Sequence, residues 1–252
     1  MHRFQISPGS IKEGLVILDP KESHHALSVL RVKPGETVEL LDGKGGSYQG
    51  VIASSQKGRV KVSVSAPRAV RQKSRVPVTL AVSVIKPERM ELLIQKACEL
   101  GADRIIPLIS ERTVVRLSRE RWEAKGVRWQ KIAAESCKQC ARAQTPEILG
   151  VVEFKKFIGQ VSGYGTVLIP TLAVPVKSLY HSLNANKDAH SVLVLIGPEG
   201  DFSRSEVESA ILSGAQPVTL GPLVMRSETA ALYTLSVVRF FYGEGPSLAS
   251  SQ

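Results

Sequence analysis

The stretch VLVLIGPEGDFSRSEVESAILSGAQPVTLGPLVMRSETAALYTL, residues 192–235, decides the fold. It contains two apolar runs, residues 192–196 and 217–220, and each stops at a Gly-Pro pair shortly before a helical pattern begins. A short buried strand, a sharp loop and a helix, repeated once, predict an α/β sheet with a ligand site at the carboxyl ends of its strands. Ser203 and Glu206, three residues apart, predict a capping box at the start of the first helix.

Two further apolar runs lie upstream of this stretch. Residues 78–85 are apolar and β-branched, and apolar side chains then recur at helical spacing from Met90 to Leu100. A second apolar run follows at residues 105–109. Strand, helix and strand within about 30 residues predict a βαβ unit with parallel strands. The other elements predicted in this part are a long helix over residues 118–142, a strand over 167–169 and a weak helix over 176–183.

The first 72 residues follow a different pattern, in which short apolar runs alternate with glycine-rich turns. This alternation predicts a small β-barrel or sandwich. Ser23 is expected to cap a short helix that ends near Leu30. The predicted strands cover residues 15–18, 37–41, 47–52 and 60–64, a basic linker covers 66–76, and a disordered tail covers 243–252.

Positive charge is concentrated near the N-terminus. The 252 residues have a formal net charge of +10, and residues 1–75 hold 13 of the 33 lysines and arginines but only 6 of the 23 acidic residues. A basic domain joined to a nearly balanced one indicates a polyanionic partner such as nucleic acid. A basic surface that contributes only to solubility is the alternative.

The composition argues against membrane and secreted proteins. No apolar run approaches the roughly 20 residues of a membrane-spanning helix, and the N-terminus lacks the apolar core of a signal peptide. Three cysteines do not make a disulfide framework. We therefore expect a cytoplasmic protein.

Two motifs resemble metal or redox sites, but their surroundings do not fit. His24-His25 has no other ligand nearby, and Cys137-x-x-Cys140 has no second pair. Redox CxxC pairs normally begin a helix, whereas this pair falls well inside a predicted one. We expect structural cysteines and no metal. The phosphate-binding motifs GxxxxGK[ST] and GxGxxG are absent.

The segments GPEGDFS, residues 197–203, and LGPLVMRSETA, residues 220–230, resemble the paired signatures of the SPOUT methyltransferases, most closely the RsmE family. Further matching segments are HHALSVLR at 24–31, KPERM at 86–90, ERTVV at 111–115 and RWQKIAAE at 128–135. That family methylates N3 of a uridine in 16S rRNA of the small ribosomal subunit, with S-adenosylmethionine as donor. The resemblance implies an α/β fold with a PUA-like RNA-binding β-barrel over residues 1–72 and a trefoil-knotted methyltransferase domain over 73–252. It also implies a homodimer.

The resemblance further implies where the ligands bind. Three strand-ending loops would surround S-adenosylmethionine, and ordinary turns are the alternative reading of these loops. The expected cofactor residues are Ile169, Pro170, Thr171, Leu172, Ile196, Gly197, Pro198, Glu199, Gly200, Leu220, Gly221, Pro222, Leu223, Val224 and Met225. The expected RNA contacts are Arg3, His25, Arg31, Lys33, Arg112, Gln139 and Arg142.

Methylation at N3 needs two kinds of side chain, because uracil N3 is a poor nucleophile until its proton leaves. Arg226 suits the first role, since its permanent charge and planar fork can stabilise the uracil anion. Glu228 can accept the proton, directly or through water. A salt bridge is the alternative role for Arg226, and stabilisation of the last helix is the alternative role for Glu228.

The chain departs from the family pattern at three positions. Leu223 stands where the family usually has an arginine, Lys138 replaces an acidic residue, and Ala141 replaces a glycine. The changes at Lys138 and Ala141 are expected to alter details of the substrate contact. The guanidinium missing at Leu223 implies either a weaker hold on the substrate or a compensating cation at Arg112 or Arg142. Two rival functions remain open: a SPOUT enzyme for another RNA site, and a noncatalytic RNA-binding assembly protein.

Overall fold

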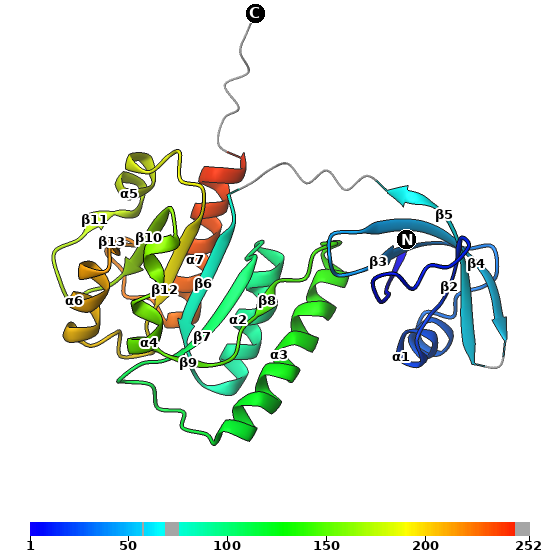
Figure 1. Cartoon of the computed structure of the whole chain (residues 1–252), viewed down its shortest axis with the longest axis horizontal. Helices are drawn as coiled ribbons and strands as arrows, with labels where there is room; N and C mark the ends of the chain where they lie inside the picture. The colour runs from blue at the N-terminus through cyan, green and yellow to red at the C-terminus, as the bar shows by residue number, and fades with distance from the viewer. Residues whose placement is uncertain (57, 69–75, 245–252) are drawn as a thin grey trace, which may run out of the picture. The chain divides into compact units, whose positions relative to one another are not determined.

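A computed structural model describes residues 1–56, 58–68 and 76–244 of the chain (Figure 1). Contacts divide the chain into two compact units. One unit combines Met1–Lys73 with Ala134–Thr145, and the other combines Ser74–Ala133 with Pro146–Gln252. The predicted boundary at residue 72 does not anticipate that Ala134–Thr145, from the end of a long helix, group with the N-terminal residues.

The first unit is built on a five-stranded sheet with the order β1-β3-β4-β5-β2. Strand β1 pairs with β3 in parallel, and the remaining pairs are antiparallel. The buried side chains of Phe4, Leu40 and Val62 lie in its hydrophobic core. The elements are β1 (His2–Gln5), β2 (Leu15–Ile17), α1 (Pro20–His24), the π-helical turn η1 (His25–Val29), β3 (Thr37–Leu41), β4 (Ser47–Gln56) and β5 (Arg59–Arg68).

Two expectations for this unit were wrong or incomplete. Asp19, not Ser23, is the N-cap of α1, and its carboxylate accepts a hydrogen bond from the backbone N–H of Glu22 at 2.8 Å. Ser23 is buried one turn later, where its hydroxyl donates to the carbonyl of Leu18. Strand β1 was not predicted, because only one of its four residues, Phe4, is buried and its pairing depends on β3. The predicted linker and tail fall largely outside the described residues, but β5 extends to Arg68, inside the range predicted as linker, and η3 extends to Glu244, inside the range predicted as tail.

Lys138, one of the departures from the family pattern, has a structural role within the first unit. Its ammonium lies 2.8 Å from a carboxylate oxygen of Glu22 and 3.1 Å from one of Glu135. The side chains of Lys138 and Glu22 are only 14% and 6% exposed. Burial alone lowers the pKa of Lys138, but the hydrogen bonds and charges of the two glutamates outweigh it, so that the pKa lies above the ordinary lysine value.

Lys138→Ala should therefore destabilise the protein. The substitution leaves the carboxylate of Glu22 buried without its cation, which costs about 3 kcal/mol in the free energy of unfolding, as measured by urea denaturation. Lys21→Ala is the matched control, because Lys21 pairs with Glu135 at a site where its side chain is 73% exposed; its cost should stay below about 1 kcal/mol. Equal costs for the two variants would contradict this role of Lys138.

The second unit is built on a parallel eight-stranded sheet with the order β11-β13-β10-β12-β6-β7-β8, and β9 also pairs with β7. Its strands are β6 (Val78–Ser83), β7 (Arg104–Ile109), β8 (Glu147–Ile148), β9 (Val152–Glu153), β10 (Thr166–Pro170), β11 (Lys177–Ser178), β12 (Val192–Ile196) and β13 (Gln216–Thr219). Its helices are α2 (Pro87–Glu99), α3 (Arg119–Gln139, whose end belongs to the first unit), α4 (Phe154–Ile158), the 3-10 turn η2 (Val161–Gly163), α5 (Leu179–Ala185), α6 (Arg204–Leu212), α7 (Ser227–Arg239) and the π-helical turn η3 (Phe240–Glu244).

The position of β12 in the middle of the sheet explains why its sequence is apolar at every position. Leu193 and Leu195 pack with residues of α4 and α6, while α7 contacts β12, β6 and α2. A strand covered by helices on both faces needs a continuous apolar run rather than an alternating one. The predicted βαβ unit is confirmed as β6-α2-β7, with β6 and β7 parallel. The trefoil knot stays a prediction.

The cysteines lie close to where they were expected, with one correction. Helix α3 ends at Gln139, so Cys140 follows the helix and Cys137 lies in its last turn. Cys137 is buried and Cys140 is half-buried. An interaction with Cys137, together with burial, raises the pKa of the Cys140 thiol, which keeps it protonated at neutral pH. Within the described ranges, no group of three or more histidine, cysteine or acidic side chains can hold a metal ion.

Candidate functional site

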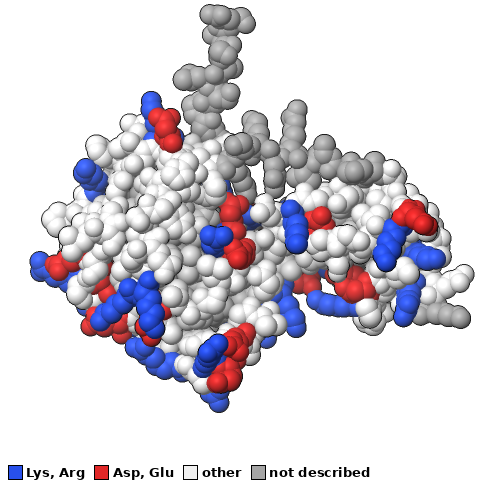
Figure 2. Space-filling model, in the orientation of Figure 1, with Lys and Arg blue, Asp and Glu red and all other residues white. Residues whose placement is uncertain are grey.

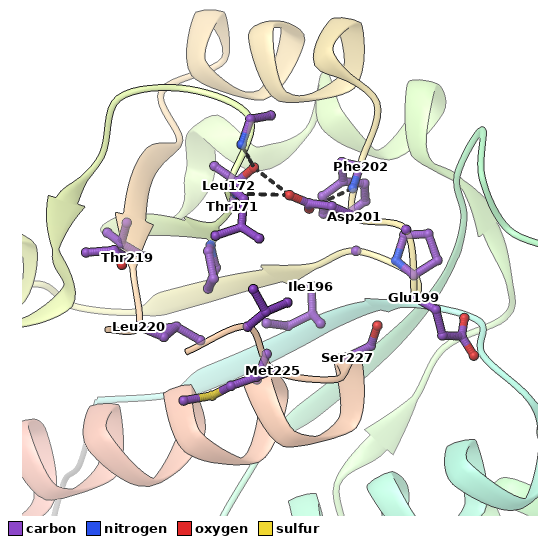
Figure 3. Close-up of a pocket in the computed structure, with 18 of the residues that line it drawn as sticks. Thr171, Leu172, Ile196, Glu199, Asp201, Phe202, Thr219, Leu220, Met225 and Ser227 are labelled. Carbon is purple, nitrogen blue, oxygen red and sulfur yellow. Dashed lines mark hydrogen bonds between the residues drawn. The ribbon is translucent and has the colours of Figure 1, made fainter. Parts of the chain in front are cut away.

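The carboxyl ends of β10, β12 and β13 lie together at one edge of the parallel sheet, because β10 pairs with both of the other strands. The loops that follow these strands surround a pocket of about 490 Å³ (Figure 3). This volume lies within the range of about 300–1,000 Å³ that is usual for small-molecule sites. The site is therefore at the edge of the sheet that the repeated strand-loop-helix pattern predicted.

Most of the residues expected in the three loops line this pocket. They are Pro170, Thr171, Leu172, Ile196, Gly197, Pro198, Glu199, Gly200, Leu220, Gly221, Leu223, Val224 and Met225. Ile169 does not line it, because its side chain is fully buried in the core under α4 and α6. Pro222 is exposed and is also absent from the lining. Whether the lining residues bind the cofactor stays a prediction.

Several residues that line the pocket were not predicted from the sequence. They are Ala173, Asp201, Phe202, Arg204, Val218, Thr219, Ser227 and Ala230. Asp201 and Phe202 belong to the GPEGDFS segment, so the motif itself was a usable signal for them. Arg112, expected to contact RNA, also lines the pocket, and its guanidinium donates to the carbonyl of Gly200 at 2.6 Å.

The loop after β12 is a tight turn that requires glycine at its first position. A Cβ atom at Gly197 would lie 2.7 Å from the backbone nitrogen of Phe202 and 3.0 Å from the carbonyl carbon of Asp201. The chain thus folds back on itself at residues that line the pocket. Ser203 then caps α6, and the predicted capping box with Glu206 is confirmed. The same Glu206 carboxylate accepts a hydrogen bond from the backbone N–H of Glu111 at 2.8 Å, next to Arg112.

The two candidate catalytic residues lie at the start of α7. Arg226 is the exposed N-cap residue, between the lining residues Met225 and Ser227. The alternative role of Arg226 in a salt bridge has no support among the described residues, where no ion pair involves its side chain. Glu228 lies in the first helical turn, and neither Arg226 nor Glu228 lines the pocket itself.

Glu228 interacts with an arginine that the sequence reading did not select. The Nε atom of Arg89, on α2, lies 3.7 Å from Oε1 of Glu228, and its Nη1 atom lies 3.8 Å from Oε1 of Glu199. The Glu228 side chain is 12% exposed. Its Oε2 atom is buried and has no hydrogen-bond partner among the described residues. One carboxylate oxygen thus faces a cation, and the other can accept a proton or a hydrogen bond.

The expected RNA contacts are divided between the two units. Arg3, His25, Arg31, Lys33, Gln139 and Arg142 belong to the first unit, and Arg112 belongs to the second. Arg3 is already engaged within its unit, since it pairs with Glu39 at 2.9 Å and donates to the carbonyl of Gln139. Arg31 and Lys33 are exposed. Figure 2 shows basic and acidic side chains intermixed over the visible face, rather than one continuous basic patch.

Two known families match successive parts of the chain. A family described as RNA methyltransferase domain matches residues 72–239, and one described as RNA methyltransferase PUA domain matches residues 18–65. Ribosomal RNA small subunit methyltransferase E of Synechocystis sp. is 29% identical, over 94% of this chain and 77% of the relative. The protein of that name from Bacillus subtilis is 27% identical, over 87% and 88% of the two chains.

Solved structures resemble nearly all of the chain. The crystal structure of a ribosomal RNA small subunit methyltransferase E from Neisseria gonorrhoeae, bound to S-adenosyl methionine, has a TM-score of 0.86 and 30% identity, and the match covers 98% of this chain and 100% of that one. A protein from Legionella pneumophila described as a putative methyltransferase, in complex with the same cofactor, has a TM-score of 0.81 and 33% identity, over 94% and 96% of the two chains.

Proposed function

Since the chain belongs to the ribosomal RNA small subunit methyltransferase E family of RNA methyltransferases, we propose that it methylates N3 of a specific uridine in 16S rRNA. It is an rRNA methyltransferase, and S-adenosylmethionine is its methyl donor. The observation that most supports the proposal is the pocket at the ends of β10, β12 and β13, whose lining follows the three loops implied by the family resemblance. A ribosomal substrate would place the reaction in the cytoplasm.

The pocket residues fit S-adenosylmethionine in size and chemistry. Leu172, Leu220 and Met225, which are apolar, line the pocket together with the polar residues Thr171 and Thr219. Apolar walls with a few polar groups are typical of a site for an adenosyl ligand. When bound, the cofactor supplies an electrophilic methyl group on a sulfonium. The protein's task is then to align the uracil nitrogen with that methyl group, which lowers the barrier by orientation.

We assign the acid–base work to the start of α7. The fixed charge of Arg226 stabilises the negative charge that uracil carries on O2 or O4 once the N3 proton has left. Glu228 accepts that proton, directly or through water, while Arg89 lies beside its Oε1 atom. The position of both residues outside the pocket lining suits a role toward the uracil rather than toward the methyl donor.

Affinity for the cofactor distinguishes the proposed enzyme from its rival, a noncatalytic RNA-binding assembly protein. Titration calorimetry with S-adenosylmethionine should show saturable binding to the wild-type protein. Radiolabelled donor should then transfer its methyl group to small ribosomal subunits that lack the modification. Absence of binding would remove the enzymatic proposal. Binding with transfer to another base or another RNA would retain the enzyme but replace its substrate.

We also propose that the protein is a homodimer that buries the rim of the pocket. Leu172, Leu223 and Val224 line the pocket and are 70%, 74% and 80% exposed. Large apolar side chains gathered at one exposed place indicate a protein interface. Leu223 would thus contribute apolar contact area where the family usually has an arginine.

Leu223→Asp should shift the protein from dimer to monomer in sedimentation velocity experiments, because burial of an unpaired carboxylate opposes association. Leu212→Asp is the control: Leu212 is 89% exposed at the end of α6, does not line the pocket, and should leave the sedimentation coefficient unchanged. A wild-type protein that stays monomeric at micromolar concentration, or an unchanged dimer of the Leu223→Asp variant, would contradict the proposed interface.

A further inference from the structure

Asp201 has a backbone conformation that only a few residue types adopt readily. Its φ angle is +59°, in the left-handed region, and it is not a glycine. Such residues are strained unless their surroundings fix them, and they cluster at ligand clamps and active sites. Aspartate and asparagine tolerate this region better than other side chains, because a short polar side chain can bond to nearby backbone. We therefore expect the contacts of the Asp201 side chain to stabilise this conformation.

The carboxylate of Asp201 connects two of the loops that form the pocket (Figure 3). Its Oδ2 atom accepts a hydrogen bond from the hydroxyl of Thr171 at 2.8 Å and another from the backbone N–H of Leu172 at 3.1 Å. Its Oδ1 atom accepts one from the backbone N–H of Phe202 at 2.7 Å. Thr171 and Leu172 follow β10, whereas Asp201 and Phe202 follow β12. One ionised side chain thus ties together loops that are about 30 residues apart.

The hydrogen-bond network extends one step further along the first loop. The hydroxyl of Thr171 also accepts from the backbone N–H of Ala173 at 3.1 Å. Thr171 is nearly fully buried, so its hydroxyl lies in a place where solvent competes little for these bonds. Hydrogen bonds to an ionised group are roughly twice as strong as neutral ones. The pair of Asp201 and Thr171 therefore fixes three consecutive residues of the loop, Thr171 to Ala173, and all three line the pocket.

We propose that Asp201 is a positioning residue that braces the two loops and holds the methyl-donor pocket in its binding shape before the ligand arrives. The inference rests on the proposed function only in naming S-adenosylmethionine as the ligand. A loop that is already ordered loses less conformational entropy on binding, so a braced pocket binds more tightly than the same contacts on a mobile loop. Asp201 acts through Thr171 and Leu172 and takes no part in methyl transfer.

Two variants remove the brace in different ways. Asp201→Gly deletes the carboxylate without straining the backbone, since glycine adopts positive φ freely. Thr171→Val deletes the hydroxyl at nearly constant volume. Thr171→Ser is the conservative variant, because it keeps the hydroxyl. Asp201→Asn is a second conservative variant, which retains one acceptor oxygen at a residue type that tolerates this conformation.

The affinity for S-adenosylmethionine, measured by calorimetry, gives the first test. We expect Asp201→Gly and Thr171→Val each to weaken binding about tenfold, as loss of a charge-assisted hydrogen bond would. Thr171→Ser should bind within about twofold of wild type, with Asp201→Asn between the extremes. In steady-state kinetics KM for the donor should rise while kcat changes little. The double variant Asp201→Gly/Thr171→Val should lose less affinity than the two single losses added together, because both single variants remove the same Asp201–Thr171 hydrogen bond.

Hydrogen exchange of the ligand-free protein gives a second test that does not depend on the proposed function. The amides of Leu172 and Phe202 should lose protection in Asp201→Gly, whereas those of β12 should keep theirs. Unchanged protection at these two amides, wild-type affinity of Asp201→Gly, or additive losses in the double variant would each overturn the brace. If the wild-type protein failed to bind S-adenosylmethionine, the proposed function would fail, and hydrogen exchange would still decide whether Asp201 braces the loops.

Discussion

Arg226→Ala is expected to lower kcat for methyl transfer by about 10²–10³-fold, the usual effect of removing one group that stabilises charge in the transition state. The affinity for S-adenosylmethionine should change little, because Arg226 does not line the pocket. The side chain is exposed and forms no ion pair within the described part of the chain, so it is available to a substrate. The measurement is single-turnover transfer of labelled methyl groups to small ribosomal subunits.

Two further variants interpret this result. Arg226→Lys keeps the charge and loses the planar fork, so its rate should lie between those of wild type and Arg226→Ala. Lys156→Ala is the control for a lost surface cation, because Lys156 is exposed on α4 and pairs only with Glu153 among the described residues; its rate should equal that of wild type. Full methyl transfer by Arg226→Ala with intact cofactor binding would remove Arg226 from the mechanism.

Gly197→Ala is expected to weaken S-adenosylmethionine binding by about a hundredfold. The new Cβ would overlap the backbone of Asp201 and Phe202, which cannot yield as a flexible side chain can. Forcing extra volume into such a place typically costs about 1–3 kcal/mol, and every 1.4 kcal/mol of that cost corresponds to a factor of about ten in affinity if the bound shape is displaced. Calorimetric titration measures the loss, with a thermal melt to establish that the variant is folded.

Gly200→Ala is the comparison within the same loop. The nearest atom to its new Cβ would be Cδ of Arg112 at 3.5 Å, an ordinary contact with a flexible side chain. Its loss of affinity should be at least several times smaller than that of Gly197→Ala. Gly150→Ala, where no atom lies within 4 Å of the new Cβ, should bind as wild type does. Equal losses of affinity in Gly197→Ala and Gly200→Ala would show that the close approach of Gly197 to the backbone of Asp201 and Phe202 does not determine the shape of the pocket.

Local sequence patterns predicted much of the second unit. The apolar runs at β6, β7 and β12, the helix α2 and the capping box of α6 depend on residues a few positions apart. The position of the pocket could be predicted from these strands, because parallel strands present their carboxyl ends at one edge of the sheet. The N-cap of α1 was misassigned since Asp19 and Ser23 both have capping side chains, and only the fold decides which one is free to cap.

The contacts that could not be predicted from the sequence join residues that are far apart along the chain. Asp201 reaches Thr171 across 30 residues, and Arg89 on α2 reaches both Glu199 and Glu228. Lys138 looked like a change in substrate contact, but its partner Glu22 is 116 residues away in the sequence. Periodicity and capping rules carry no information about such pairs, because they describe neighbours on one helix or strand. Of the two cations considered to compensate for Leu223, only Arg112 lines the pocket with it.

We propose that this chain places a methyl group on N3 of a uridine in 16S rRNA, with Arg226 as the catalytic cation. Mass spectrometry of 16S rRNA nucleosides tests it directly, in a strain that lacks the gene and in the same strain complemented with wild-type or Arg226→Ala copies. We predict that N3-methyluridine is absent from the deletion strain, returns with the wild-type copy and stays absent or strongly reduced with the Arg226→Ala copy. Persistence of N3-methyluridine in the 16S rRNA of the deletion strain would contradict the proposed substrate.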